Sequence, residues 1–243
     1  MLPKAKKFLS QNFLVDENKK QKIIQAAEIK KGETVLEIGP GTGTLTKALV
    51  DAGASVIAIE ADKDLIKPLK NRFGDSVDLI HSDVLSDLSV LSDLSDLSFK
   101  LIANIPYNIT SPILEKFLTN SPRPSRMVLM VQKEVADRIT AKPPKMSLFS
   151  VVCQIYAKCE RVAIVKAGAF RPIPKVDSAI VRLDLYPYNQ EKVIALAKRG
   201  FSSKRKQLKT NLGPRGVEKL KQLGLDAKIR AQELTVEDWI GLL

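Results

Sequence analysis

A glycine-rich stretch near the start of the chain has the composition of a ligand-binding turn. The sequence EIGPGTGTL occupies residues 37–45, between a short apolar run and a helical pattern. Its three alternating glycines allow the backbone to approach a ligand closely. A dinucleotide-binding fingerprint would place glycine at position 44, where this chain has threonine. The spacing therefore favours a nucleoside that carries an amino acid over NAD.

Two acidic residues accompany the next two apolar runs. Glu60 ends the run SVIAIE, and Asp83 closely follows the run VDLIH. A carboxylate at the first position can accept hydrogen bonds from both hydroxyl groups of a ribose. One at the second position can accept a hydrogen bond from an adenine amino group. Each acid alone is weak evidence, because carboxylates at strand ends are usually solvated, but their order after the glycine turn predicts one nucleoside-binding crevice.

The tetrapeptide Asn104-Ile105-Pro106-Tyr107 suits methylation of an exocyclic amine on a nucleobase. Such a nitrogen is a poor nucleophile, because its lone pair is conjugated with the ring. The Asn104 side-chain oxygen and the Ile105 carbonyl can each accept one amino hydrogen, which draws the lone pair toward an incoming methyl group. Pro106 stiffens the loop, and Tyr107 offers a ring on which an extruded base can stack. Without the nucleoside motifs, the same residues would equally suit an ordinary turn after a strand.

Short apolar runs alternate with helical patterns through the middle of the chain, as in a parallel sheet with crossover helices. The predicted strands are residues 34–38, 55–60, 77–81, 99–104 and 126–132. The predicted helices lie near residues 16–28, 43–52, 62–72, 110–119 and 133–140. This pattern predicts an α/β, Rossmann-like, doubly wound sheet, with the three motifs along its carboxyl edge.

The pattern changes in the last third of the chain. Two β-rich runs, residues 160–165 and 178–186, are not separated by a long helix and predict an antiparallel edge of the sheet. Residues 186–189 (YPYN) form a turn-like breaker, and only helical patterns follow. We therefore expect a Rossmann-like domain over residues 1–186 and a small helical domain over 187–243. The repetitive stretch at residues 84–98 is interpreted as a surface crossover without a function of its own.

The positive charge is concentrated at the two ends of the chain. The formal net charge is +12, of which residues 1–31 carry +5, residues 32–185 carry +1 and residues 186–243 carry +6. Between residues 192 and 217 there are eight Lys and Arg residues and no acidic residue. A solvated helix face would usually interleave the two signs, so this run favours a nucleic acid as the partner.

Several classes of protein are disfavoured by the composition. The single histidine, His81, makes histidine-rich zinc sites and Ser-His-Asp triads hard to assemble, so no metal is expected. Cys153 and Cys159 are expected to be reduced, buried thiols. No apolar run approaches the roughly 18 residues of a membrane span, and the start of the chain lacks a secretory signal. We therefore expect a cytoplasmic protein without a membrane anchor.

Further motifs, taken with those above, resemble the KsgA (RsmA) and Dim family of rRNA adenine N6,N6-dimethyltransferases from Gln11 almost to Leu243. They are QNFL at 11–14, NIPYNITSPIL at 104–114, VQKEVADRI at 131–139, FRPIPKVDSAIVRL at 170–183, FSSKRKQLKTNL at 201–212 and ELTVEDW at 233–239. The resemblance implies a class I methyltransferase with S-adenosylmethionine as the methyl donor. It also implies dimethylation of two adjacent adenosines near the 3′ end of small-subunit rRNA, by a monomer acting on an immature ribosomal subunit.

The resemblance also implies roles for individual residues. The donor would be bound by Gln11, Asn12, Leu14, Gly39, Gly41, Glu60, Asp83, Val84 and Asn104. Catalysis would use Asn104 and Tyr107 together with Phe170, which would stack the target adenine opposite Tyr107 while Pro172 and Pro174 hold it rigidly; core packing is the alternative for Phe170. The RNA would be contacted by Lys133, Arg138, Arg171, Lys175, Lys204, Arg205 and Lys206.

The sequence differs from the family pattern in two places, and its motifs leave three alternative functions open. Where the family has Tyr-Gly-x-Leu-Ser, this chain has MSLFS at residues 146–150, and its tail is somewhat short. An Erm-type large-subunit rRNA methylase shares the glycine turn and the NIPY motif, although the PKVDS and ELTVEDW stretches favour the KsgA family. A non-catalytic RNA-binding assembly factor would not need Asn104, Tyr107 and Glu60 together. An NAD-dependent oxidoreductase is disfavoured by Thr44.

Overall fold

The computed structural model describes residues 6, 11–87, 91, 94, 97–187, 190–203, 205–226 and 228–243. The chain forms two compact units. The first comprises Met1–Ala136 and Glu160–Leu185, and the second comprises Asp137–Cys159 and Tyr186–Leu243. Residues 137–159 thus group with the C-terminal residues, whereas the sequence suggested one boundary after residue 186. Seven of the fifteen residues of the crossover at 84–98 lie outside the described residues, and within the described part Leu91 and Leu94 are buried.

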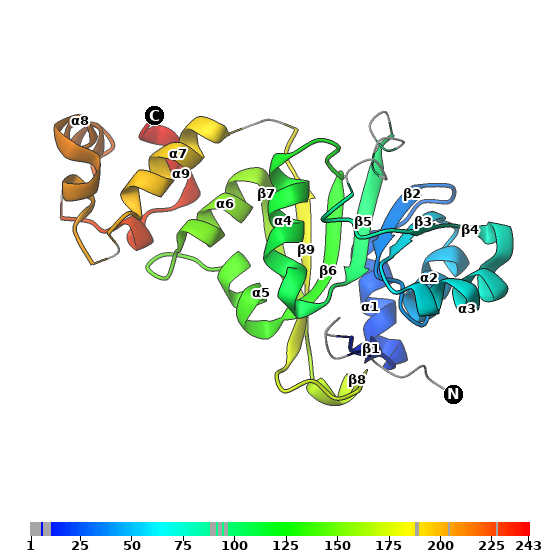
Figure 1. Cartoon of the computed structure of the whole chain (residues 1–243). Coiled ribbons are helices and arrows are strands. Elements are labelled where there is room, and N and C mark those ends of the chain that lie inside the picture. The colour runs from blue at the N-terminus through cyan, green and yellow to red at the C-terminus, as the bar shows by residue number, and fades with distance from the viewer. Residues whose placement is uncertain are drawn as a thin grey trace. The chain divides into compact units, whose positions relative to one another are not determined.

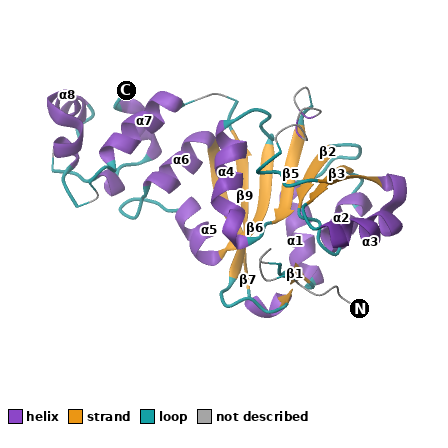
Figure 2. Ribbon diagram, viewed as in Figure 1, coloured by secondary structure: helices purple, strands orange, loops and turns teal. Residues whose placement is uncertain are grey.

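A seven-stranded sheet forms the core of the first unit (Figure 2). Its spatial order is β4 (Val77–His81), β3 (Ser55–Glu60), β2 (Thr34–Ile38), β5 (Phe99–Asn104), β6 (Arg126–Gln132), β9 (Ser178–Leu185) and β7 (Ala157–Val165). The first five strands run parallel, and β9 pairs antiparallel with β6. The predicted α/β sheet with its antiparallel strand is therefore confirmed. The strand order reverses between β2 and β5, which opens a crevice at their carboxyl ends.

Each helix of the first unit lies between two strands in chain order (Figure 1). They are α1 (Glu17–Ala27), α2 (Thr44–Asp51), α3 (Lys63–Phe73), α4 (Thr110–Thr119) and the start of α5 (Lys133–Ile139). Asp16 and Asp62 cap the N-termini of α1 and α3 by accepting hydrogen bonds from backbone N–H groups. Packing of α1 on β5 and β6, and of α3 on β3 and β4, covers strands whose apolar residues are almost fully buried.

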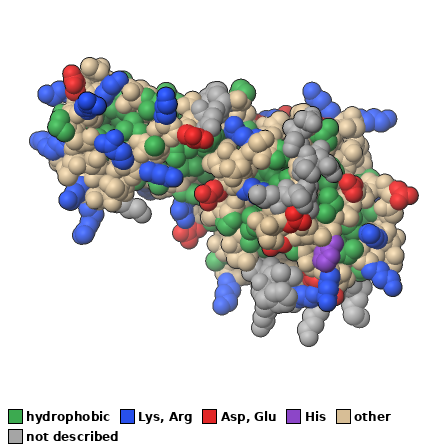
Figure 3. All heavy atoms as spheres, turned by 45° about the horizontal axis from the view of Figure 1, so that its top comes forward, with side chains coloured by type: hydrophobic (Ala, Val, Ile, Leu, Met, Phe, Trp, Pro, Cys, Tyr) green, Lys and Arg blue, Asp and Glu red, His purple; other side chains and the backbone are tan. Residues whose placement is uncertain are grey.

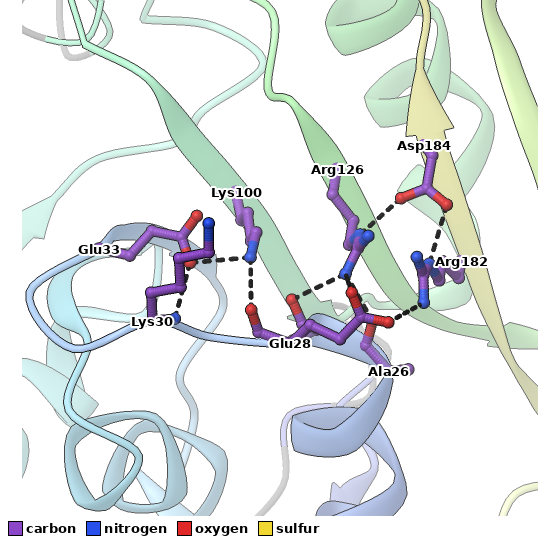
Figure 4. Close-up of polar contacts among 9 residues, drawn as sticks. Ala26, Glu28, Lys30, Glu33, Lys100, Arg126, Arg182 and Asp184 are labelled. Carbon is purple, nitrogen blue, oxygen red and sulfur yellow. Dashed lines mark hydrogen bonds and ion pairs between the residues drawn. The ribbon is translucent and has the colours of Figure 1, made fainter.

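An ion-pair network holds the C-terminus of α1 against the amino ends of the strands (Figure 4). Glu28 ends the helix in the left-handed conformation, with φ of 49°, and its carboxylate pairs with Arg126 at 2.8 Å and Arg182 at 2.6 Å. Arg126 also pairs with Asp184 and donates hydrogen bonds to the last carbonyl groups of α1. The buried Lys100 donates to the Glu28 carbonyl at 2.8 Å. This network lies at the edge of the sheet opposite the crevice.

The Glu28 carboxylate should make the stability of the protein sensitive to acid. Hydrogen bonds from Arg126, followed by those from Arg182, lower the pKa of Glu28 from its ordinary value of 4.5 to about 2. Because the folded-state pKa is the lower one, this contribution is present above about pH 4.5 and is lost as the pH falls toward 2. Glu28→Gln should therefore flatten the pH dependence of the unfolding free energy in that window, measured by urea titration.

The matched control is Asp78→Asn, which removes an exposed carboxylate from β4 of the same unit. It should leave the slope of stability against pH between 4.5 and 2 close to that of the wild type. Equal slopes for Glu28→Gln and the wild type would show that the network in Figure 4 does not couple folding to protonation.

The second unit is helical after residue 190. It contains α6 (Leu148–Tyr156), α7 (Glu191–Gly200), α8 (Leu208–Gln222) and α9 (Val236–Gly241). Trp239 is fully buried, with its ring centroid 5.7 Å from that of Phe201. Gly200 is required at this contact, because a Cβ atom there would lie 2.2 Å from the Trp239 ring. The ELTVEDW stretch therefore closes the core of this unit.

The MSLFS stretch begins helix α6. The Ser147 hydroxyl accepts a hydrogen bond from the Ser150 backbone N–H, and the Ser150 side chain accepts one from the Ser147 backbone in return. This capping box fixes the helix start. Cys153 in α6 is buried, as expected, whereas Cys159 in β7 is only half-buried, and neither forms a disulfide bond within the described residues. Among the described residues, no helix has both the length and the apolar composition to cross a membrane.

Candidate active site

A cavity of about 240 Å³ lies at the carboxyl edge of the sheet, around the ends of β2, β3 and β5. Its wall also includes the loop that follows β4. The residues predicted to bind the donor all line it, namely Gln11, Asn12, Leu14, Gly39, Gly41, Glu60, Asp83, Val84 and Asn104. Tyr107 lines the same cavity. The structure thus brings the nucleoside-binding motifs and the NIPY loop into one site.

The glycine turn has a backbone conformation that other residues adopt only with strain. Gly39, Gly41 and Gly43 have φ values of 66°, 59° and 73°. A Cβ atom on Gly41 would lie 3.1 Å from the Phe13 ring, and one on Gly43 would lie 2.6 Å from the Phe73 ring. Glycine is therefore needed at these two positions both for the conformation of the turn and for its packing.

Glu60 is held rigidly at the end of β3, with only 5% of its surface exposed. One carboxylate oxygen accepts a hydrogen bond from the Gly41 N–H at 3.0 Å, and the other accepts one from the Asp62 N–H at 2.9 Å. Burial raises the pKa of the Glu60 carboxyl, and these backbone donors oppose that shift. Each oxygen keeps a lone pair for a further hydrogen bond, so the carboxylate can accept from two neighbouring hydroxyl groups.

Glu37 is a second carboxyl group in the cavity wall, and sequence reasoning gave it no role. It is 1% exposed, and its Oε2 atom has no hydrogen-bond partner among the described residues. Burial, together with the nearby charge of Glu60, raises the pKa of Glu37 to about 8. Glu37 is therefore mostly protonated at neutral pH, which relieves its repulsion toward Glu60. Its orphaned oxygen fits a ligand that brings polar groups into the cavity.

The N-terminal segment forms another wall of the cavity. Gln11 Nε2 donates a hydrogen bond to Asp62 at 2.9 Å, beside the Glu60 loop. The short strand β1 (Phe13–Leu14) then pairs antiparallel with β8 (Phe170–Arg171), and the two labels lie close together in Figure 1. The Leu14 carbonyl accepts a hydrogen bond from Thr44 Oγ1 at the start of α2. Contacts with residues distant in sequence thus hold residues 11–14 in the wall of the cavity.

The Asn104 side chain is fixed by the same segment. Its Nδ2 atom donates a hydrogen bond to the Asn12 backbone carbonyl at 2.9 Å. Because a carbonyl oxygen can only accept, this contact sets which end of the amide is the oxygen. Oδ1 is left as the acceptor that a substrate amine requires. The role of the Asn12 backbone could not be read from residue types, since any residue supplies a carbonyl.

Tyr107 is anchored by a residue that sequence reasoning did not single out. Its hydroxyl lies 2.6 Å from the Ser178 hydroxyl, and Ser178 is fully buried at the start of β9. Burial raises the pKa of Tyr107, so the phenol stays neutral at physiological pH. The hydrogen bond fixes the position of the ring at the cavity wall, where a stacking role requires it.

Phe170 lies apart from the cavity. Its side chain is 0% exposed and packs in the main apolar cluster with Leu14, Val165 and Ile180. In this conformation the ring presents no face to a base, and the packing corresponds to the alternative raised from sequence. Stacking on a target adenine remains a prediction that requires the ring to leave the core.

The sequence comparisons identify the family of the chain. The family model described as "Ribosomal RNA adenine dimethylase" matches residues 2–243. The chain belongs to the ribosomal RNA adenine dimethylase family. Ribosomal RNA small subunit methyltransferase A of Acaryochloris marina is 41% identical, over 99% of this chain and 97% of the relative. The protein of the same name from Dehalococcoides mccartyi strain CBDB1 is 39% identical, over 97% and 86%.

Two solved structures of RNA methyltransferases have the same fold as this dimethylase. A dimethyladenosine transferase from Plasmodium falciparum superposes with a TM-score of 0.83 at 28% identity, over 95% of this chain and 96% of that one. The 23S rRNA methyltransferase ErmE gives a TM-score of 0.81 at 28% identity, over 95% and 98%. The Rossmann-like methyltransferase fold is therefore confirmed, and the protein is an enzyme.

S-adenosylmethionine is the methyl donor of the dimethylase family, and the cavity fits it. Glu60 offers two fixed oxygens for the ribose hydroxyl groups. Asp83 uses one oxygen to accept from the Leu85 N–H at 3.0 Å, which leaves the other for an adenine amino group. The orphaned Glu37 oxygen lies in the same wall. The described residues contain no group of three or more His, Cys, Asp and Glu side chains that could hold a metal ion.

The residues predicted to contact RNA are divided between the two units of the dimethylase. In the first unit Arg171 and Lys175 are exposed, whereas Lys133 is half-buried. In the second unit Arg205 and Lys206 are exposed, as is Arg138, whose guanidinium lies 4.8 Å from the Phe149 ring centroid. Lys204 lies outside the described residues. Figure 3 shows Lys and Arg side chains spread over the C-terminal helices, with few acidic side chains among them.

Proposed function

We propose that this enzyme transfers methyl groups from S-adenosylmethionine to the N6 amines of two adjacent adenosines near the 3′ end of small-subunit rRNA, in an immature ribosomal subunit. The observation that carries the proposal is the fixed orientation of Asn104, which leaves its amide oxygen as an acceptor beside the donor cavity. The relatives named small subunit methyltransferase A support the choice of RNA.

The chemistry follows from positioning rather than from a strong base. In the first transfer the Asn104 oxygen and the Ile105 carbonyl each accept one hydrogen of the target amine, so that its lone pair turns out of conjugation with the ring. In the second transfer the monomethylated amine has one hydrogen left, which one of these two acceptors binds. The amine releases one proton to solvent in each transfer. The Tyr107 ring, held by Ser178, supports the extruded base. S-adenosylmethionine supplies an electrophilic methyl group when bound. Because the described residues of one chain line the cavity, we propose that the enzyme acts as a monomer. We also propose that it is cytoplasmic and that it works without a metal ion.

The decisive experiment maps the methylated adenosines by mass spectrometry. The wild-type protein and labelled donor are incubated with small subunits that lack adenine methylation, beside large-subunit RNA. Two adjacent N6,N6-dimethyladenosines in the small-subunit RNA are expected. Label in the large-subunit RNA would instead favour an Erm-type activity, which is the alternative raised by the structural similarity to ErmE. Binding without any transfer would indicate an assembly factor.

The basic C-terminal stretch should contribute to RNA affinity through phosphate contacts. If Lys204, Arg205 and Lys206 each contact a phosphate, replacing all three with glutamine should flatten the dependence of log affinity on log salt. Each lost contact should reduce the slope by roughly 0.7 to 0.9. The measurement is RNA binding across a salt series, with donor affinity measured in parallel and expected to stay unchanged.

The control triple variant replaces Lys63, Lys67 and Lys70, three exposed lysines on α3, with glutamine. It removes the same charge from the first unit. It should change the slope by less than the roughly 0.7 expected for the loss of one phosphate contact. If both triple variants keep the wild-type slope, the stretch is an ordinary solvated face and the RNA is held elsewhere.

A further inference from the structure

The loop at residues 172–177 is attached to the catalytic loop at both of its ends. At its start, β8 pairs with β1, and the residue that precedes β1 holds the Asn104 amide. At its end, Ser178 holds the Tyr107 hydroxyl. The position of this loop is therefore fixed relative to the two residues that would contact the target base.

The loop exposes aliphatic side chains to solvent. Ile173 is 62% exposed, the largest value among the large hydrophobic side chains of the described residues, and Val176 is 45% exposed. Pro172 and Pro174 flank Ile173 and fix φ on both sides, so little conformational entropy is lost when the loop contacts a partner. Ile173 is therefore a large apolar side chain that is held rigidly in solvent and is available for contact with a substrate.

The charges around the loop fit a polyanion. Arg171 is exposed at its base, where its Nη1 atom donates to the carbonyl groups of Gly168 and Phe170 at 3.0 and 2.8 Å. Lys175 is exposed within the loop. Asp177, the acidic residue of the loop, pairs with Lys166 at 2.9 Å and accepts from a backbone N–H. The cations are therefore free of a strong acidic neighbour within the loop and can face phosphates.

We propose that Ile173 is a wedge that enters the RNA stack when the target adenosine is drawn into the active site. The inference rests on the proposed function. Extruding a base leaves a gap between its neighbours and costs their stacking. An apolar side chain that fills the gap restores part of the lost contact, as wedges do in proteins that unstack nucleic acids. Arg171 and Lys175 hold the flanking phosphates while Ile173 occupies the gap.

The test compares binding with single-turnover methylation on small subunits that lack adenine methylation. Ile173→Ala and Ile173→Ser should lower the single-turnover rate about tenfold or more, with subunit affinity changed less than threefold because the phosphate contacts remain. Ile173→Phe should keep a rate within threefold of the wild type, since an aromatic ring can also fill the gap. Affinity for S-adenosylhomocysteine should be unchanged in all three variants.

The matched control is Leu97→Ala, which trims another exposed aliphatic side chain of the first unit, next to the amino end of β5. It should leave both rate and affinity unchanged. An Ile173→Ala rate within twofold of the wild type would overturn the wedge alone. A wild-type protein that methylates no adenosine of the subunit would overturn the proposed function, and the wedge with it.

Discussion

Asn104→Ala is expected to abolish methyl transfer while the protein still binds its donor. The variant removes the oxygen that would accept a hydrogen from the target amine, and the loss of one such electrostatic group at a reacting centre costs about 10²- to 10³-fold in rate. It also releases the Asn12 carbonyl, so the loop loses its fixed position. Single-turnover methylation of small subunits measures the rate, and calorimetry with S-adenosylhomocysteine should show affinity within about tenfold of the wild type.

Two comparison variants separate this role from a general loss of structure. Asn71→Ala removes an exposed asparagine from α3 and should methylate at the wild-type rate. Asn104→Asp keeps the size of the side chain but replaces the Nδ2 donor with an oxygen that repels the Asn12 carbonyl. It should therefore also be inactive. Full activity in Asn104→Ala would refute the assigned role.

Glu60→Ala is expected to weaken donor binding by about 1.5 to 3 kcal/mol, which is the scale of charge-assisted hydrogen bonds. This corresponds to a roughly 10- to 150-fold rise in Kd. The carboxylate accepts from the backbone of Gly41 and Asp62, so its removal also loosens the glycine turn. Calorimetry with S-adenosylhomocysteine measures the change, and a thermal melt of each variant shows how much of it comes from a less stable fold.

A second ligand isolates the contact between Glu60 and the ribose. The wild type should bind S-adenosylhomocysteine more tightly than its 2′,3′-dideoxy analogue, because the analogue has no hydroxyl groups to donate to Glu60. In Glu60→Ala and Glu60→Gln this preference should shrink toward unity, whereas Asp78→Asn should retain it. A preference that survives in both Glu60 variants would assign the ribose hydroxyl groups to another residue.

The parallel strands could be predicted from the sequence because their signal is local. The run RMVLMVQ contains five consecutive apolar residues, as expected of a strand covered on both faces, and five strands lie where they were predicted. The rules of parallel sheets then placed Glu60 and Asn104 at one edge without further information. The resemblance to the family added the other donor residues, including Gln11, Asn12 and Leu14, and all nine line a single cavity.

The features that could not be predicted depend on tertiary contacts. Helix α6 has the sequence LFSVVCQIY, whose β-branched and aromatic residues do not favour a helix, and it is set by the Ser147 capping box and by burial. The strands β1 and β8 have two residues each and exist only because they pair. The role of Ser178 follows from its hydrogen bond to Tyr107, which only the folded structure shows. The unpaired oxygen of Glu37 can be recognised only when the cavity around it is known.

The pairing of β1 with β8 also joins two segments of the chain that are synthesised at different times. Phe13 leaves the ribosome early in synthesis, but its partner Arg171 is made much later. Chains fold as they emerge, N-terminal part first. A nascent chain that ends before β8 already contains every residue predicted for the donor, yet the segment that steadies Asn104 has nothing to pair with. We therefore expect the wall of the donor pocket that contains β1 to reach its final position only after β8 has been synthesised.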